Sequence, residues 1–189
     1  MKIKPRKASV ISIAVGFLLL CAAAYSAADM EILLSGTIQE SQVFNGPANL
    51  TVRILTLKPG DKLPWHYHPG YAFNVVKSGT LTVEDGCGSK KTLTAGQGFE
   101  EVGGRVHRGR NLSDTDTIVY DCFLIPQDKQ TTITFPGEES RCGPPMETDE
   151  CKNNGWRKFD HPRTFTNQSQ CLSFVRNLRD KRFQFQSAD

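Results

Sequence analysis

The sequence predicts an all-β fold, either a closed barrel or a double-sheet jelly roll. Between residues 29 and 126 it is a succession of short segments rich in Val, Ile, Thr, Leu and Phe, separated by glycine-containing turns. No convincing helical pattern interrupts this series. Many short strands at close spacing are typical of antiparallel barrels and jelly rolls.

Eight segments are expected to be strands because β-branched and aromatic residues dominate each of them. Ser78-Gly79 and Asp85-Gly86 supply the turn residues that two of the hairpins need. Near the C-terminus, apolar residues recur at roughly helical spacing and predict a short helix over 168–177. The expected strands are 37–44, 50–57, 71–77, 80–84, 90–93, 98–102, 106–110 and 117–125.

The first 28 residues are expected to be a secretory signal peptide. Four basic residues precede an apolar run from Val10 to Ala24, and the small residues Ser26-Ala27-Ala28 come directly before Asp29. This order of charged, apolar and cleavage-site regions is typical of exported proteins. An uncleaved anchor is the alternative, but the run is shorter than the roughly 20 residues that span a bilayer. We therefore expect a periplasmic or secreted protein with no stable membrane span after cleavage.

Charge and composition argue against a nucleic-acid-binding protein. The sequence has 23 basic and 20 acidic side chains, and the leader contains four of the basic ones and none of the acidic ones. The mature chain keeps 19 basic and 20 acidic side chains, a formal charge of −1. The basic residues near the C-terminus are expected in a solvated tail, so we expect no nucleic-acid partner.

Two half-sites of similar design occupy the centre of the sequence, from residue 60 to residue 111. Each begins with a glycine and brings histidine to a fixed distance from it. The first reads Gly60-x5-His66-x-His68-x3-Ala72-x6-Gly79, and the second reads Gly96-x5-Val102-x-Gly104-x2-His107-x3-Asn111.

The three histidines of these half-sites have the arrangement of metal ligands. Residues i and i+2 of a strand face the same side, so His66 and His68 can point together into a barrel. His107, from a later strand, can supply a third imidazole. Imidazole binds Fe, Zn, Cu, Ni and Mn, and the spacing does not select among them. The sequence therefore predicts a divalent transition metal with open positions for water or a chelating small-molecule ligand.

The half-sites resemble the two motifs of the cupin superfamily. In that family the first motif provides two His and a Glu, the second provides a His, and the four bind a divalent metal inside a double-stranded β-helix barrel. Both histidines and both glycines of the first motif are in register here, as are Gly96, Gly104, His107 and Asn111 of the second. The resemblance implies a single cupin-type jelly-roll barrel.

Two positions depart from the family pattern. Ala72 stands where cupins usually have the Glu ligand, and Val102 stands where they usually have Pro. One outcome is a true three-histidine site, which resembles that of a minority of cupin dioxygenases. The other is a substitute carboxylate from Glu101, which strand alternation places on the same face as Phe99. A carboxylate inside an apolar barrel needs a partner such as a metal, whereas a solvated strand edge is the alternative position for Glu101.

Four further side chains near the histidine pair are candidates for contacts with a ligand. Trp65, Tyr67 and Tyr71 bracket the histidines, and an aromatic rim can stack on a planar or sugar-like molecule. Core packing is the alternative for each of them. Asn74 has the same strand parity as Ala72, so it either lines the cavity or satisfies a backbone bulge.

Five cysteines remain after the leader, and in an exported protein they can be oxidised. Cys151 and Cys171 would close a loop of roughly 20 residues, a link worth about 3 kcal/mol to a small unit. Two free thiols are the alternative. Cys87 could pair with Cys142, although sequence does not fix the connectivity. Cys122 lies in an apolar segment and is expected to be a small core residue.

The expected organisation is a leader, a barrel, a linker and a small C-terminal module. Their ranges are 1–28, 29–126, 127–150 and 151–189. The run Cys151-Lys-Asn-Asn-Gly-Trp156 resembles a small module of unknown function at the ends of exported bacterial proteins. We expect a disulfide to staple this appendage to itself.

Two function hypotheses follow from the resemblance and the histidines. The first is an exported, metal-dependent cupin enzyme, a dioxygenase acting on a small chelating molecule. The second is a non-catalytic cupin module that binds a small ligand or carbohydrate. A homodimer is compatible with either hypothesis, and fold alone does not choose between them.

Overall fold

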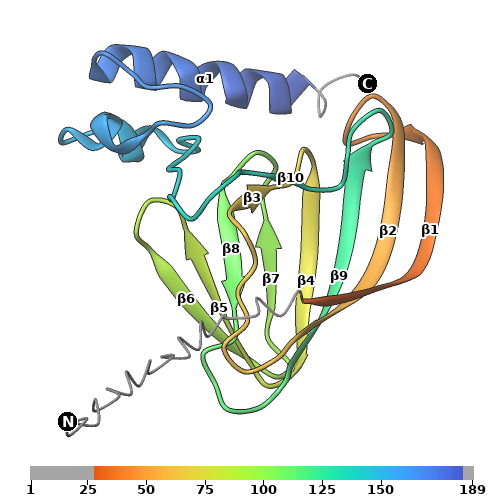
Figure 1. Ribbon diagram of the computed structural model, residues 1–189. Coiled ribbons are helices and arrows are strands. Elements are labelled where there is room, and N and C mark those ends of the chain that lie inside the picture. Colours follow the sequence, from red (N-terminus) through yellow and green to blue (C-terminus); the bar gives the residue numbers. More distant parts are fainter. Residues whose placement is uncertain (1–27, 185–189) are drawn as a thin grey trace, which may run out of the picture.

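The computed structural model describes residues 28–184, with side chains through residue 178. The predicted signal peptide, residues 1–28, lies outside the described residues apart from its last position. Two five-stranded antiparallel sheets face each other, and a small helical module lies across one end of them (Figure 1). The predicted all-β class and jelly-roll barrel are confirmed, as is the C-terminal appendage.

Both sheets mix strands that lie far apart in the sequence. The first sheet has the order β1-β2-β9-β4-β7, and the second has the order β10-β3-β8-β5-β6. The strands are β1 (Asp29–Ser41), β2 (Gly46–Leu57), β3 (His66–Tyr67), β4 (Tyr71–Ser78), β5 (Thr80–Asp85), β6 (Lys90–Thr94), β7 (Gly98–Glu101), β8 (His107–Arg110), β9 (Thr117–Pro126) and β10 (Ile133–Thr134).

The barrel interior is apolar at one end and polar further along. In β9 every second residue from Thr117 is buried, which is the alternation of a strand with one face in a core. Leu55 of β2 pairs with Val119 of β9, while Arg53 pairs with Asp121 one inward-facing row further along. The apolar end consists of Leu55, Leu57, Leu63, Val76, Leu81, Leu93 and Val119.

The eight expected strands are all present, with shifted ends. β1 begins at Asp29, eight residues before the predicted start, and almost all of it is exposed, so burial imposes no alternation there. β3 and β10 have two residues each and pair with one another. Segments of that length carry no periodic signal, so the sequence did not predict them. The predicted C-terminal helix is confirmed as α1 (Gln168–Gln184), which continues beyond its expected end.

The C-terminal module has a small core of its own, built on a disulfide. Cys151 ends the short 3-10 helix η1 (Thr148–Cys151) and is bonded to Cys171 in α1. A second 3-10 helix, η2 (Gly155–Lys158), completes the module. The buried members of its core are Cys142, Cys151, Phe159, Phe165, Cys171 and Val175.

A second disulfide ties this end of the chain to the barrel. Cys87, in the turn between β5 and β6, is bonded to Cys142. A Cβ atom on the neighbouring Gly86 would collide with the carbonyl oxygen of Arg141, so only glycine allows the two segments to approach this closely. Among the described residues Cys122 is the free cysteine, and it is half-buried on the outward side of β9 rather than in the core.

The segment between the barrel and the module, residues 127–150, is more than a linker. It contributes β10 to the second sheet, so part of residues 127–150 packs with the barrel. The domain limits given above stay a prediction. Within residues 28–184, no helix has the length and hydropathy required to cross a membrane.

Candidate metal centre

The three predicted histidines meet inside the barrel, on the second sheet. His66 begins β3, His68 follows the end of the same strand, and His107 begins β8. His66 and His107 are direct partners across the β3–β8 pair. All three side chains are buried, with relative exposures of 4%, 2% and 5%. The i, i+2 spacing and the strand pairing together bring the rings to one place.

Each of the three rings is oriented by a backbone carbonyl. The Nδ1 atoms of His66, His68 and His107 lie 2.8, 2.7 and 2.8 Å from the carbonyl oxygens of Pro64, Thr131 and Arg105. A carbonyl oxygen accepts only, so each Nδ1 carries the hydrogen and donates it. The lone pair of a neutral ring is then on Nε2, which is the arrangement found in histidines that bind metals.

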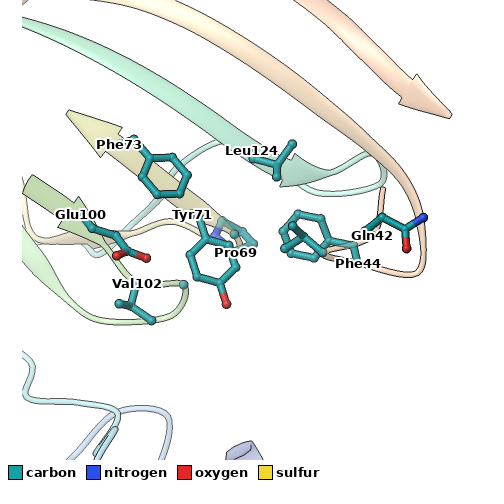
Figure 2. A pocket seen from close by; sticks show the side chains of 11 residues that line it. Gln42, Phe44, Pro69, Tyr71, Phe73, Glu100, Val102 and Leu124 are labelled. Atoms are coloured by element: carbon teal, nitrogen blue, oxygen red, sulfur yellow. The ribbon is translucent and has the colours of Figure 1, made fainter. Parts of the chain in front are cut away.

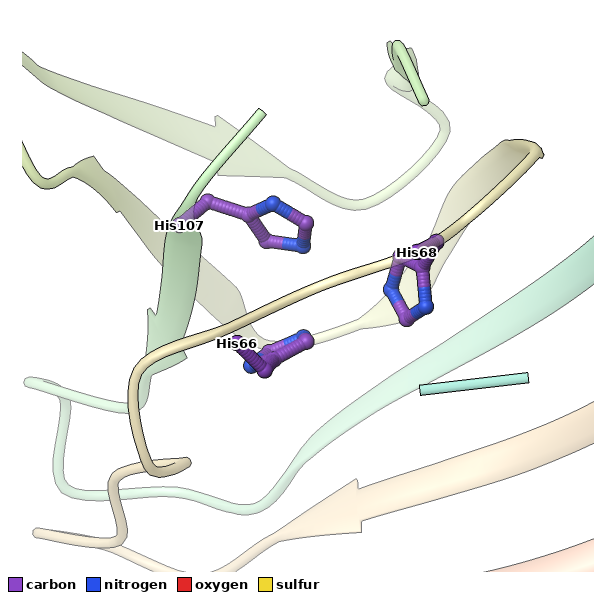
Figure 3. A group of neighbouring side chains, drawn as sticks. All are labelled: His66, His68 and His107. Carbon is purple, nitrogen blue, oxygen red and sulfur yellow. The ribbon is translucent and has the colours of Figure 1, made fainter. Parts of the chain in front are cut away.

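The free nitrogens converge on one point. One potential ligand atom from each ring lies within 4.8 Å of the other two, and the rings of His66, His68 and His107 surround a common space (Figure 3). Within the described part of the chain, the Nε2 atom of His107 is buried without a hydrogen-bond partner. In their neutral forms the three rings direct converging lone pairs at one point, an arrangement that fits a divalent metal ion.

Glu101 points at the same space from the first sheet. Its Oε2 atom lies 3.4 Å from Nε2 of His68, and its Oε1 atom lies 3.1 Å from Nε2 of His107. The second contact is an ion pair when His107 carries a proton. Glu101 is the direct partner of Ala72 across the β4–β7 pair. The carboxylate absent at position 72 is therefore present on the adjacent strand, over a residue small enough to leave room for it.

The charges of this cluster are strongly coupled. Burial lowers the pKa of His66 to about 3, and the neighbouring His107 and His68 add to the effect, so this ring is neutral at physiological pH. Burial also works to lower the pKa of His107, but the Glu101 carboxylate outweighs it and the net pKa is raised. Burial works to raise the pKa of Glu101, but His107 and His68 hold it well below its usual range. The carboxylate is ionised and stabilises positive charge beside it.

Comparison with known protein families agrees with this geometry. Residues 53–123 match the family model described as a cupin domain. This chain contains a cupin domain. No functionally curated relative matches the sequence.

Solved structures of similar shape come from several bacteria. One is an uncharacterized conserved protein with a double-stranded β-helix domain from Klebsiella pneumoniae, with 19% identity, coverage of 59% of this chain and 87% of that chain, and a TM-score of 0.46. A cupin-like protein from Thermotoga maritima has 20% identity, coverage of 56% and 74%, and a TM-score of 0.42. DMSP lyase DddQ from Ruegeria pomeroyi has 16% identity, coverage of 64% and 58%, and a TM-score of 0.48.

The aromatic residues predicted to contact a ligand lie in three different surroundings in the cupin domain. Trp65 is 4% exposed; its Nε1 donates to the carbonyl oxygen of Glu138, and the guanidinium of Arg108 covers its ring. Tyr67 packs against the rings of Phe135 and His161. Neither lines the centre.

Tyr71 lines a surface hollow whose lining does not include the histidines. This hollow has a volume of about 680 Å³. Figure 2 shows Tyr71 and Phe73 beside Glu100 and Val102, with Phe44 and Leu124 at the other side. The histidines and Glu101 instead line two smaller spaces, an inner cavity and a cleft at the barrel surface.

Asn74 faces the barrel interior, as its parity predicted. It is 3% exposed, and both polar atoms of its amide lack a hydrogen-bond partner among the described residues. In the β4–β9 pair its direct partner is Asp121. The amide is thus available to a polar group within the barrel.

A buried ion pair that the sequence analysis missed borders the centre. Arg53 Nε donates to Asp121 Oδ2 over 2.7 Å, and both residues line the same inner cavity as His66 and His68. Burial raises the pKa of Asp121 to about 6 although Arg53 opposes the shift. Strand alternation could have revealed this pair, because Arg53 and Asp121 each occupy an inward-facing position of an otherwise apolar strand. The cavity measures about 20 Å³, enough for one water molecule.

Proposed function

We propose that this cupin domain is a metal-dependent enzyme for a small molecule, with His66, His68, His107 and Glu101 as the metal ligands. The convergence of three tautomer-fixed Nε2 atoms with an ionised carboxylate carries the proposal. Three neutral imidazoles and one carboxylate suit a divalent transition ion such as Fe, Mn, Zn, Ni or Cu. A bound ion would supply Lewis-acid or redox chemistry to a chelating substrate.

The protein's own residues have separate tasks in this proposal. The backbone carbonyls of residues 64, 105 and 131 hold the rings in the ligand tautomer. Glu101 partly neutralises the ion, and the apolar end of the barrel keeps bulk water away from it. Dioxygenase activity is the proposed reaction class because the cupin resemblance implies it.

A metal analysis of matched variants tests the ligand set. We expect His66→Ala and Glu101→Ala each to lower the affinity for the ion by at least about tenfold, since loss of an outer partner alone costs that much. In the double variant Ala72→Glu/Glu101→Ala the carboxylate returns to the adjacent strand, and we expect metal binding to recover. The readout is metal content after dialysis against a chelator series. Full retention of metal in Glu101→Ala would establish a three-histidine site instead.

Activity is tested separately. Protein loaded with Fe(II) without air should consume O2 in the presence of one member of a panel of diketones, thiols, catechols and flavonols. His66→Ala is the matched control and should not respond. If no member of the panel causes O2 uptake by protein that has bound iron, the dioxygenase class is wrong while the metal site stands.

A non-catalytic binding module is the second candidate, and one observation favours it. The aromatic hollow around Tyr71 is larger than the space next to the metal centre. A carbohydrate or planar molecule held there would need no metal. We would then expect ligand binding to survive His66→Ala and to be lost in Tyr71→Ala, measured by calorimetry against a panel of oligosaccharides.

Export and self-association are also proposals. The two disulfides are compatible with an oxidising compartment, periplasmic or extracellular. N-terminal sequencing of protein from the periplasm should begin at Asp29 if the leader is cleaved there. Exposed apolar side chains on β1, such as Ile32 and Leu34, offer a surface for a homodimer, which light scattering would detect.

A further inference from the structure

A cleft of about 470 Å³ separates the barrel from the segment that leads into the C-terminal module. Its volume is in the range of small-molecule sites, and it reaches two of the four side chains at the metal centre. The lining residues are Val83, Asp85, Lys91, Leu93, Phe99, Glu100, Glu101, Val102, Arg105, His107, Met146, Glu147 and Glu150.

The cleft lies along a seam of the barrel. β7 is the last strand of the first sheet and β6 is the last strand of the second, and no ladder joins them. His107, whose buried Nε2 atom lies 3.1 Å from Glu101 Oε1, is one of the residues that line the cleft. The inner cavity, which Glu101 also lines, has room for about one water molecule. Of these two spaces that Glu101 lines, the cleft is the one with room for a molecule larger than water.

The outer wall of the cleft is rigidly attached to the barrel. The Nη1 atom of Arg105 donates to the Pro144 carbonyl over 3.0 Å and to Glu150 Oε1 over 2.9 Å. The backbone N–H groups of Met146 and Glu147 donate to Glu150 Oε2. The disulfide from Cys142 to the turn after β5 anchors the same segment. Met146 therefore belongs to a segment that is fixed to the barrel, and it lines the same cleft as Glu101 and His107.

The cleft is lined by an excess of negative charge. Five of its side chains are carboxylates and two are cations, and the guanidinium of Arg105 already contacts Asp85 and Glu150. Even with a divalent ion at the centre, one negative charge remains in excess. Phe99, Leu93 and Met146 add apolar surface. Such a surface disfavours anions and suits uncharged or cationic molecules with an apolar part.

We propose that the C-terminal segment around Met146 is the outer wall of the substrate site, and that the cleft selects uncharged or cationic organic molecules over anions. This inference rests on the proposed metal-dependent function. It gives the appendage a role in specificity, because the barrel alone would leave the seam open to solvent.

The size of the cleft is tested with cobalt(II)-loaded protein and two neutral probes, imidazole and phenylimidazole, through the visible spectrum of the metal. Met146→Trp should lower the affinity for phenylimidazole by at least about tenfold and the affinity for imidazole by less than about twofold. Only the larger probe reaches the added indole ring. Met146→Ala should instead strengthen phenylimidazole. Leu34→Trp, at an exposed position of β1, is the control and should change neither affinity.

The charge preference is tested with azide on the same protein. Imidazole should bind more tightly than azide. Glu100→Lys should raise the affinity for azide about fivefold, because it replaces one negative charge at the rim by a positive one and solvent only partly screens that change. If phenylimidazole affinity is the same in both Met146 variants while cobalt is bound, the proposed wall is wrong and the metal site stands. Failure of the wild-type protein to bind cobalt would overturn the proposed function and this inference together.

Discussion

At the scale of single residues, the candidate centre depends on which atom carries a proton. The Nδ1–H groups are fixed by carbonyls, so the lone pair of each neutral ring is on Nε2. His66 is kept neutral by burial, whereas His107 beside Glu101 has a raised pKa. When His107 is protonated on Nε2, a form that the nearby Glu101 carboxylate favours, the proton occupies the position that a metal ion would take. Proton and metal therefore compete.

This competition predicts the pH dependence of metal binding. Because the pKa of His107 is raised, this ring stays protonated up to a higher pH than a free histidine. The affinity for the metal ion should therefore fall as the pH falls through the pKa of His107, and it should be constant at higher pH. Uptake of an ion should release about one proton in the lower range. Calorimetry of zinc binding in two buffers with different ionisation enthalpies counts that proton. A proton count of zero throughout would show that His107 is already neutral and would contradict the assigned pKa direction.

At the scale of elements, the stability of the C-terminal module comes more from its disulfide than from its small core. Few buried residues surround the bond between η1 and α1, and a core this small contributes little stability alone. The module therefore needs a covalent restraint on its unfolded state, which a loop closed over a sequence separation of 20 provides.

Removal of that bond should loosen the module and spare the barrel. Cys151→Ser combined with Cys171→Ser should lower the free energy of unfolding of the module by about 3 kcal/mol. Hydrogen exchange of α1 should rise while that of β9 stays slow. The control is Cys122→Ser, which removes a free thiol. Equal acceleration of exchange in α1 and β9 would instead mean that the two parts unfold as one unit.

At the scale of the whole molecule, Arg105 connects the module, the barrel and the metal centre. Its guanidinium contacts Pro144, Glu150 and Asp85, and its carbonyl oxygen accepts the Nδ1–H group of His107. Its side chain is 21% exposed, so these contacts are partly shielded from solvent. The segment that orients one metal-directed ring is thereby the segment that holds the C-terminal wall.

Loss of this connection should cost more than loss of an exposed ion pair. Arg105→Met should lower the free energy of unfolding of metal-free protein by about 2 kcal/mol, because hydrogen bonds to charged groups are lost and Glu150 keeps only its backbone donors. Lys58→Met removes an exposed pair with Asp116 and should have little effect. Urea denaturation compares the two variants. Similar losses would show that Arg105 is an ordinary surface residue.

The sequence by itself determined the parts of this protein that depend on local pattern. Strand alternation, turn residues and the spacing of His66, His68 and His107 were sufficient for the all-β barrel and for the three rings on one side of it. Parity also placed Glu101 on the same face as Phe99, but it left open whether the carboxylate lies inside the barrel or at a solvated strand edge. Local pattern did not predict β3 and β10, because two-residue strands show no periodicity and are defined only by their pairing with other strands.

Only the tertiary structure decided which side chains share a space. The register of β4 against β7 places Glu101 opposite Ala72, and the β2–β9 register joins Arg53 to Asp121. Register depends on how distant strands pair, and no local pattern encodes it for residues far apart in sequence. The rings of Trp65 and Tyr67 lie away from the histidine pair, because neighbours in sequence alternate between the two faces of a strand. Folding also brings Met146 and His107 to the lining of one cleft, an arrangement that neither segment specifies alone.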